Sequence, residues 1–508
     1  MRKILILTAV ALLLSGWSAT AAIPPTAAQE SVEKISSQKI FSRAVVGVFA
    51  VTASGDTIVA YNPEVKMVPA SNMKLISTGL ALRRLGEDFR FETRLAYSGE
   101  VVSGVLKGDL YIIGGGDPTT GSKAQCALPV DYQFSQWAKL ISDAGICRIE
   151  GDIIADPRFF DNPMAENPGW SYDDIGTYYG TGPLGLNFFE SQQNFYITPG
   201  AAPGQTPNIE ARFPETPWMK YVNDAKTGEP RSANTVACIN TALAPYAQFV
   251  GEFPVDRKAY TLESSNRFGS YTCAYYFYNY LNNNGISVSG AYADLSQDGY
   301  VREFPGDFAS QRKAAASEEM VSLGSCYSSP LSEIARETNC ESNNFFAETL
   351  LKMLAIKERG SCKEDFNVET AEDLMVRYGL SLSGRCQIFD GSGLSRKNYV
   401  SPSFFVDFLS MMWRSDAREV YLHSLPQPGV KGTLEYKFMN APQEFKSRIK
   451  MKSGSMNGVR CYSGYILSSD GDPDKTIIFS LLTNNVTESS WAVSPSIDRI
   501  IEAIAAEN

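Results

Sequence analysis

Apolar and polar positions near the amino end of the chain predict two strands followed by a helix. The run at residues 45–51 (VVGVFAV) is typical of a buried strand, and residues 56–60 predict its hairpin partner. From Ser71 to Leu85 apolar residues recur at helical spacing, and Gly86 marks the end of that helix. We therefore expect two strands and a helix to place Ser71 against a sheet.

The middle of the chain has another pattern, with short strands between turn residues, predicted at residues 92–96, 105–107, 110–114 and 148–155. Residues 188–256 are rich in proline, and we interpret them as loop-like and poor in strands. An aromatic loop with Trp170, Asp173 and Asp174 is expected to line a cleft. Helical periodicity returns at residues 270–283.

Helices dominate the last third of the chain and are predicted at residues 331–357, 366–378, 401–413 and 494–507. The first of them is broken near residues 339–344, which places Ser342 on a loop between two helices. Alternating residues around Lys450, Tyr462 and Ile477 predict strands. Because roughly 270 residues or more separate Ser71 from Ser342 and Lys452, we interpret the middle as an insertion into one α/β domain.

Length and charge restrict the class of protein. A chain of 508 residues has room for about two to four domains, and its net charge of −10 argues against nucleic-acid binding. Arg2 and Lys3 precede an apolar run and then small residues, so residues 1–22 are predicted to be a secretory signal peptide. We expect export to the periplasm or cell-wall space, and no membrane span after cleavage.

The cysteines and the single histidine restrict the chemistry. Nine cysteines in an exported chain permit disulfides, and the odd number leaves at least one unpaired. Spacing suggests Cys126 with Cys147 and Cys238 with Cys273, although the sequence does not fix the connectivity. His423 is expected at a helix end or on the surface, and a Ser-His-Asp hydrolase is disfavoured. Neither H-E-x-x-H nor C-x-x-C is present, and we expect no metal or other cofactor.

Ser71 and Lys74 form a Ser-x-x-Lys pattern at the start of the predicted helix. Residues three apart on a helix share a face, so the Lys74 amine can reach the Ser71 hydroxyl. Free backbone N–H groups and the positive end of the helix dipole lie at the same place and favour an oxyanion. The same pattern begins in the polar amino-terminal tail, in a charged stretch and in an expected strand, at Ser31, Ser36, Ser310 and Ser447.

Two further motifs follow in order, Ser342-Asn343-Asn344 and Lys452-Ser453-Gly454. Lys452 comes after an alternating run, so we expect it on a strand beside the serine. A literal Lys-Thr-Gly begins at Lys226, but its surroundings have turn composition and no strand is expected there. Other Ser-x-Asn sequences begin at Ser232, Ser264 and Ser455.

With these residues the chain resembles the class C low-molecular-mass penicillin-binding proteins, the D-alanyl-D-alanine carboxypeptidase/endopeptidases of the penicillin-binding protein 4 type. A related series of three motifs marks class A β-lactamases and penicillin-binding proteins. Ser453 stands where threonine is usual, and Asn343 stands in the middle of its motif. The resemblance covers nearly the whole mature chain and is carried by residues 69–74, 108–110, 115–118, 168–170, 342–344, 390–395, 432–434 and 452–455.

The resemblance implies an α/β (α+β) fold, in which a penicillin-recognising transpeptidase domain of the β-lactamase-like type carries two inserted, mostly-β domains. On this pattern the catalytic domain is expected at residues 31–95 and 315–508. The second domain is expected at residues 96–187 and 257–314, and the third at residues 188–256.

The resemblance also implies a serine D-alanyl-D-alanine carboxypeptidase/D,D-endopeptidase that acts on peptidoglycan stem peptides and is inhibited covalently by β-lactams. Ser71 would attack the carbonyl of the penultimate D-Ala, with Lys74 as its general base. Ser342 would relay a proton to the leaving amine, and Lys452 would polarise it. A serine β-lactamase and a non-catalytic cell-wall-binding protein on the same fold remain alternatives.

The substrate would be held by four further groups. Asn344 is expected to bind the peptide backbone of the substrate. Ser453, Gly454 and Ser455 are expected along the substrate, with the serine hydroxyls near its terminal carboxylate. The backbone N–H groups of Ser71 and Ser455 would form the oxyanion hole.

Overall fold

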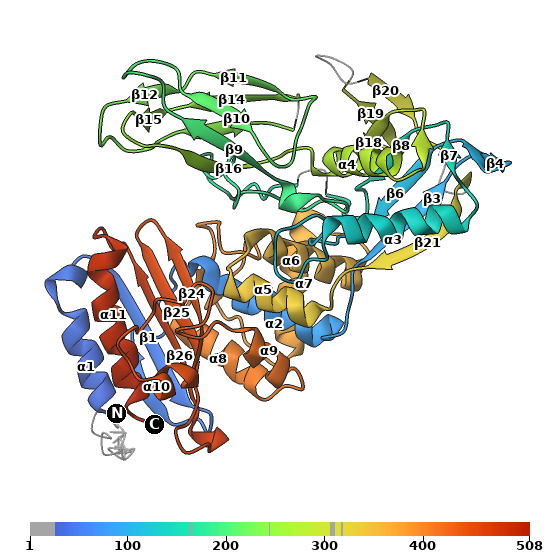
Figure 1. The fold of residues 1–508 in the computed structure, drawn as a ribbon. Coiled ribbons are helices and arrows are strands. Elements are labelled where there is room, and N and C mark those ends of the chain that lie inside the picture. Colours follow the sequence, from blue (N-terminus) through green and yellow to red (C-terminus); the bar gives the residue numbers. More distant parts are fainter. Residues whose placement is uncertain (1–25, 163–164, 243, 305–309, 316–318) are drawn as a thin grey trace, which may run out of the picture.

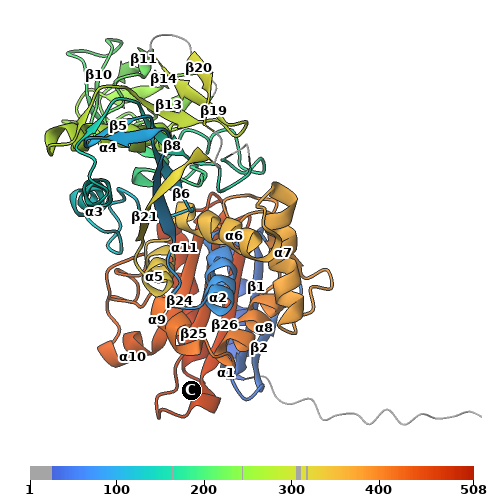
Figure 2. The same cartoon turned by 90° about the vertical axis from the view of Figure 1, so that its right-hand side faces the viewer.

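The predicted signal peptide lies outside the residues that the computed structural model describes, which are 26–162, 165–242, 244–304, 310–315 and 319–508. Figure 1 and Figure 2 show a main body, residues 26–91 and 328–508, that contains both ends of the described chain. The middle region, residues 92–327, lies above it in both views.

The main body is built on a five-stranded sheet in the order β2-β1-β26-β25-β24. β1 (Val45–Thr52) and β2 (Thr57–Tyr61) come from the amino end of the chain, as predicted. The other three come from the carboxyl end and are β24 (Ile449–Met456), β25 (Val459–Ile466) and β26 (Ile477–Asn484). β1 pairs with β26 along its whole length, so one sheet joins the two ends of the chain.

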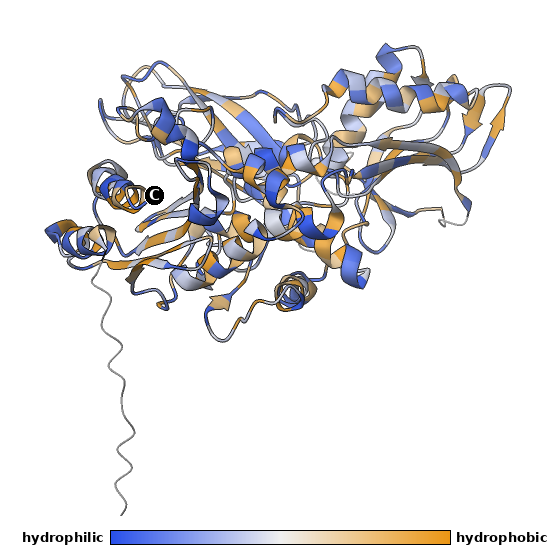
Figure 3. Ribbon diagram, turned by 90° about the horizontal axis from the view of Figure 1, so that it is seen from below, coloured by the Kyte–Doolittle hydropathy of each residue, from blue (hydrophilic) through white to orange (hydrophobic). Residues whose placement is uncertain are grey.

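Helices cover both faces of this sheet, and β26 is buried throughout. On one face α1 (Ala27–Ser36) packs with α11 (Ser490–Ala505) over an aliphatic core. On the other face α8 (Pro402–Trp413) packs on β26, in the same core as α2 (Met73–Leu85). Figure 3 shows hydrophobic and hydrophilic residues alternating along several helices, as expected for helices that bury one face.

The helix that carries the Ser-x-x-Lys pattern begins as a short 3-10 turn, η2 (Ala70–Asn72), before α2. The long helix predicted over residues 331–357 is two helices, α5 (Leu331–Cys340) and α6 (Asn344–Arg359). Ser342 lies on the loop between them, as predicted. The remaining helices and strands of this layer are α7 (Glu364–Arg377), α9 (Arg418–Ser424), β22 (Cys386–Gln387) and β23 (Tyr399–Val400).

The strand that carries Lys452 begins two residues later than predicted. Ser447 lies on α10 (Gln443–Arg448), and the strand begins only at Ile449. Pro442 precedes the helix, and its residues are exposed or half-buried. From Ile449 on the predicted alternation holds, because Ile449 and Met451 are buried and Lys450 is half-buried.

The middle region contains a seven-stranded sheet in the order β20-β19-β18-β8-β6-β3-β21. Its strands are β3 (Glu92–Tyr97), β6 (Leu110–Gly114), β8 (Ile153–Asp156), β18 (Tyr292–Leu295), β19 (Tyr300–Glu303), β20 (Ser310–Lys313) and β21 (Val321–Tyr327). A four-stranded sheet and two helices lie beside it: β4 (Glu100–Val102), β5 (Val105–Lys107), β7 (Arg148–Ile149), β17 (Ser287–Val288), α3 (Val130–Asp143) and α4 (Gly269–Asn283). Because β3 pairs with β21, the chain enters and leaves the middle region through neighbouring strands.

Residues 188–256 are rich in strands, which corrects the loop-like interpretation. With β16 (Tyr260–Ser265) they form three small sheets from β9 (Gln192–Thr198), β10 (Asn208–Ala211), β11 (Lys220–Asn223), β12 (Lys226–Gly228), β13 (Ala237–Asn240), β14 (Tyr246–Val250) and β15 (Glu252–Pro254). Phe195, Phe249 and Phe253 build a core of their own. Most of these strands are too short to show clear alternation between proline-containing turns. Lys226-Thr227-Gly228 is likewise a strand, not the predicted turn.

All nine cysteines lie among the described residues, and each is free. The suggested pairs, Cys126 with Cys147 and Cys238 with Cys273, are therefore not formed. Cys238 and Cys273 belong to different hydrophobic cores, whereas Cys147 is exposed and Cys126 is buried. Spacing along the chain did not reflect this separation in space.

Within the described residues, no helix has the length and apolar character needed to cross a membrane. In the same residues, no group of three or more His, Cys, Asp or Glu side chains is arranged to hold a metal ion. The division into a catalytic domain and two inserted domains, with its boundaries, stays a prediction.

Candidate active site

Ser71 and Lys74 lie where η2 continues into α2. Ala70 before them has a φ of +47°, a left-handed conformation that residues other than glycine rarely adopt. Lys74 is fully buried, and its Nζ donates to Ser71 Oγ at 3.0 Å. The same Nζ donates to Asn344 Oδ1 at 2.6 Å and to the carbonyl oxygen of Ser392 at 2.7 Å. The predicted pair is thus in contact, and two distant segments hold the amine.

Burial changes the charge of this amine. It lowers the pKa of Lys74 from 10.5 to about 7, while the carboxylates of Asp390 and Glu348 act in the opposite direction. A large share of Lys74 is therefore neutral near pH 7, and a neutral amine can accept a proton.

Ser342 and Lys452 form a second serine–lysine contact. Lys452 is fully buried on β24, and its Nζ donates to Ser342 Oγ at 3.0 Å and to the Ser453 carbonyl at 2.9 Å. Burial lowers the pKa of Lys452 well below its usual value, and the positive charge of Lys74 lowers it further. Three segments far apart in the sequence are therefore brought together, as predicted.

The strand that carries Lys452 lies directly against the turn that carries Ser71. A Cβ on Gly454 would lie 2.8 Å from the Pro69 carbonyl oxygen, so only glycine permits this approach. Asn72 Nδ2 donates to Ser463 Oγ on β25 at 2.7 Å. These contacts fix the two lysines relative to each other.

The Gly/Ser loop, residues 390–395, supplies the third acceptor of the Lys74 amine. Asp390 accepts hydrogen bonds from the backbone of its own loop and from Trp170 Nε1 at 3.0 Å. Glu348 on α6 accepts from the N–H of Ser392 at 2.8 Å. Burial raises the pKa of both carboxyls. From the sequence this loop was expected only as a Gly/Ser turn and as part of the family resemblance, and Glu348 was missed.

A cavity of about 780 Å³ lies beside Ser71 and is walled by both the main body and the middle region. Asp173 and Asp174 line it as predicted, whereas Trp170 is buried against Asp390. Sequence reasoning missed the other charged residues of its wall, because isolated charges carry no local pattern: Lys123, Glu190, Glu337, Glu341, Arg396 and Lys431.

The predicted substrate-binding residues lie along this cavity or next to it. Ser455 and Asn344 line the cavity, and Ser453 is half-buried on the same strand. The amide of Asn344 is engaged on both sides, since its Nδ2 also donates to the Tyr179 carbonyl at 3.0 Å. The competing Ser31 lies on α1 and does not line the cavity.

Known proteins share this sequence pattern over nearly the whole chain. A family model described as the D-Ala-D-Ala carboxypeptidase 3 (S13) family matches residues 28–507. A D-alanyl-D-alanine carboxypeptidase from Actinomadura sp. (strain R39) is 27% identical over 470 residues, which cover 90% of this chain and 81% of that protein. D-alanyl-D-alanine carboxypeptidase DacB from Haemophilus influenzae is 24% identical over 460 residues, 88% of this chain and 87% of that protein.

The fold has close counterparts among solved structures. Penicillin binding protein 4 (dacB) from H. influenzae matches with a TM-score of 0.76 at 20% identity, covering 94% of this chain and 98% of that chain. A complex of the same protein with a β-lactam matches with a TM-score of 0.71 at 18% identity, with the same coverage. The predicted fold class is thus confirmed. Because the family model spans residues 28–507, the chain belongs to the D-Ala-D-Ala carboxypeptidase 3 (S13) family of serine peptidases.

Proposed function

We propose that this serine D,D-peptidase cleaves D-alanyl-D-alanine bonds of peptidoglycan stem peptides, as a carboxypeptidase and endopeptidase, through an acyl-enzyme on Ser71. The observation that carries the proposal is the set of partners around Lys74 Nζ. Two of them, Asn344 Oδ1 and the Ser392 carbonyl, can only accept hydrogen bonds. When the amine is neutral, its two N–H groups can serve these two acceptors, which leaves its lone pair for the Ser71 hydroxyl 3.0 Å away.

The first step is attack of Ser71 Oγ on the carbonyl carbon of the penultimate D-Ala, while the hydroxyl proton passes to Lys74. The backbone N–H groups of Ser71 and Ser455 stabilise the oxyanion, each contributing roughly 3 kcal/mol. When the intermediate collapses, the C–N bond breaks, and the leaving amine takes a proton relayed by Ser342. Water then hydrolyses the ester and restores the serine.

The other residues of the site hold the substrate. Lys452 is close enough to Ser342 to polarise its hydroxyl, and with the hydroxyls of Ser453 and Ser455 it binds the terminal carboxylate. Asn344 positions the peptide backbone of the substrate, and its Oδ1 also holds the Lys74 amine. Two relatives are named D-alanyl-D-alanine carboxypeptidases, and a solved complex of H. influenzae penicillin binding protein 4 contains a β-lactam, which supports this substrate class.

Residues 1–22 support export of the chain, because their charge and apolar pattern is that of a signal peptide. We propose that the mature protein acts in the periplasm or cell-wall space, where its substrate is found.

Labelling with a fluorescent penicillin tests the proposal directly. We expect a stable adduct on the peptide that contains Ser71 in the wild-type protein and none in Ser71→Ala. Ser31→Ala is a matched control, because it alters another Ser-x-x-Lys pattern on α1, and its labelling should equal that of the wild type.

The same experiment separates the alternatives. Rapid release of hydrolysed penicillin would identify a β-lactamase, and the absence of any label would identify a non-catalytic protein. An adduct on a residue other than Ser71 would overturn the site.

A further inference from the structure

Residues of the middle region accept hydrogen bonds from both asparagines of the Ser342–Asn344 loop. Asn343 Nδ2 donates to Glu190 Oε2 at 2.8 Å, and Asn344 Nδ2 donates to the Tyr179 carbonyl at 3.0 Å. Asn343 also caps α6, because its Oδ1 accepts from the N–H of Phe346 at 3.0 Å. The position of this loop thus depends on residues about 150 positions away in the chain.

Glu190 lies on an unusual turn. Phe189, Glu190 and Ser191 have φ values of +51°, +55° and +51°, so three consecutive residues other than glycine adopt the left-handed conformation. Such strain persists only where the surrounding structure enforces it, and it gathers at functional sites. Here the turn places Phe189 in the core of the middle region and Glu190 in the wall of the cavity.

The carboxylate of Glu190 is buried and fully engaged. Besides Asn343, it accepts hydrogen bonds from Ser122 Oγ at 2.5 Å and from Gln192 Nε2 at 3.2 Å. Donors from three segments therefore fix its position, and one of them is the catalytic loop. A carboxylate held in this way can orient the asparagine more firmly than a solvated one could.

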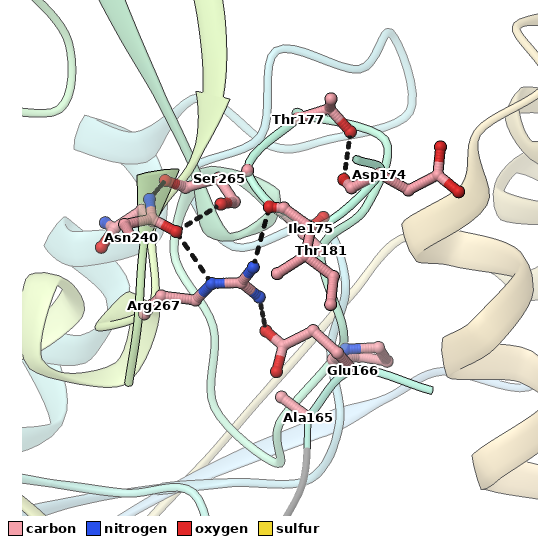
Figure 4. A network of polar contacts seen from close by, with 12 residues as sticks. Ala165, Glu166, Asp174, Ile175, Thr177, Thr181, Asn240, Ser265 and Arg267 are labelled. Carbon is pink, nitrogen blue, oxygen red and sulfur yellow. Dashed lines mark hydrogen bonds and ion pairs between the residues drawn. The ribbon is translucent and has the colours of Figure 1, made fainter. Parts of the chain in front are cut away.

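The second contact depends on the loop at residues 165–181, which Arg267 holds. Figure 4 shows the Arg267 guanidinium between Glu166, the Ile175 carbonyl and Asn240. Its Nε donates to Asn240 Oδ1 at 3.0 Å, and its side chain is only 3% exposed. This loop carries Tyr179, so the carbonyl that accepts from Asn344 is itself held in place.

We propose that Glu190 is a positioning residue for the reaction, through which the middle region holds the Ser342–Asn344 loop in its catalytic geometry. This inference rests on the proposed function. Ser342 has a φ of +59°, and no helix fixes it. A shift of the loop would move Ser342 away from Lys452 and Asn344 away from Lys74. The middle region is then part of the catalytic machinery.

The test exchanges the hydrogen-bond donor and acceptor between Asn343 and Glu190. Asn343→Asp keeps the cap on α6 but sets one carboxylate against another, and we expect acylation by penicillin to slow roughly tenfold to hundredfold. In the double variant, Glu190→Gln with Asn343→Asp, the new glutamine amide donates to the new aspartate, and acylation should return to within about threefold of the wild type. Glu190→Ala, which leaves the cap intact, should be slowed like Asn343→Asp.

A control and a second readout separate positioning from stability. Asp294→Asn alters another buried carboxylate of the middle region, which accepts from Ser270 and pairs with Arg302 away from the cavity. It should lower Tm while folded molecules are acylated at the wild-type rate. Wild-type acylation rates in folded Asn343→Asp and Glu190→Ala would overturn the inference, as would a double variant as slow as Asn343→Asp. A wild-type protein that takes no label on Ser71 would instead refute the proposed function.

Discussion

The surroundings of the buried Lys74 amine act on its pKa in opposite directions. Burial lowers its pKa to about 7, and the carboxylates of Asp390 and Glu348 limit the decrease. Only the neutral amine can take the proton of Ser71, so the acylation rate should rise with pH through about 7 and then level off. Lys74→Ala should slow acylation by about 10²–10⁴ and remove this rise, measured as second-order rate constants with a fluorescent penicillin.

The control for this prediction is Lys34→Ala, which changes the lysine of the Ser-x-x-Lys pattern on α1 and should leave the profile unchanged. A rise near pH 7 that survives in Lys74→Ala would contradict the assignment of the base.

The free energy of unfolding also depends on pH through the lowered pKa of Lys74. An unfolded lysine stays protonated up to about pH 10.4, so the unfolded state binds more protons above about pH 7. Lys74 therefore favours the folded state most above about pH 10.4, and this contribution is lost progressively as pH falls from there to about 7.

Residues with local patterns could be predicted from the sequence, and others could not. Ser71 and Lys74 share a helix face, and Lys452 stands on an alternating strand, so both lysines were found. Glu348 and Glu190 were missed, because their partners come from loops far away in the chain. A buried carboxylate with such partners has no sequence signal unless a motif surrounds it.

Between elements, Gly393 of the Gly/Ser loop lies directly against the turn before α2. Gly393 has a φ of +83°, and a Cβ there would lie 1.9 Å from the Ala70 carbonyl oxygen. Gly393→Ala should therefore push the turn that carries Ser71, slow acylation at least about tenfold and reduce the free energy of unfolding by more than about 1 kcal/mol. Urea denaturation and penicillin acylation measure the two effects.

Gly360 provides the matched control. Its φ is +71°, but a Cβ there would have no neighbour within 4 Å. Gly360→Ala should cost about 1 kcal/mol of stability from backbone conformation alone and leave acylation unchanged. Equal acylation rates in the two variants would show that the Gly393 contact does not position Ser71.

The loop held by Arg267 gives a second prediction between elements. Arg267→Gln removes a buried cation and leaves Glu166 without its partner, so the loop that carries Tyr179 should move. We expect acylation to slow about tenfold in molecules that remain folded. Arg312→Gln is the control, because Arg312 pairs with Asp109 and Asp152 at a 42% exposed position and does not line the cavity. Similar slowing in both variants would indicate general destabilisation.

Helices and strands could be predicted where they are long and their apolar residues follow a regular spacing. β1 lies in the main sheet, α8 and α11 pack on it, and all three were found within a few residues. The strands of residues 188–256 were not, because several are only three or four residues long. Their burial comes from packing within a small core that sequence spacing does not show.

For the whole molecule, the sequence indicated how the two chain ends combine but not how the cysteines are arranged. The middle of the chain was interpreted as an insertion into one α/β domain, and β1 pairs with β26, so both chain ends belong to one sheet. The suggested disulfides were wrong, because proximity along the chain does not decide which core receives a side chain. Stability is therefore expected to come from packing within these cores rather than from covalent links.

Thiol chemistry tests this picture of the whole molecule. Burial raises the pKa of the Cys126, Cys273, Cys386 and Cys461 thiols, so their reactive thiolate forms are scarce in the native protein. A charged maleimide should label exposed Cys147 first, and Cys147→Ser should lose that fast phase. After denaturation without reductant all nine cysteines should react, and dithiothreitol should leave Tm unchanged. Fewer than nine reactive thiols, or a Tm lowered by reductant, would show that disulfides link the cores after all.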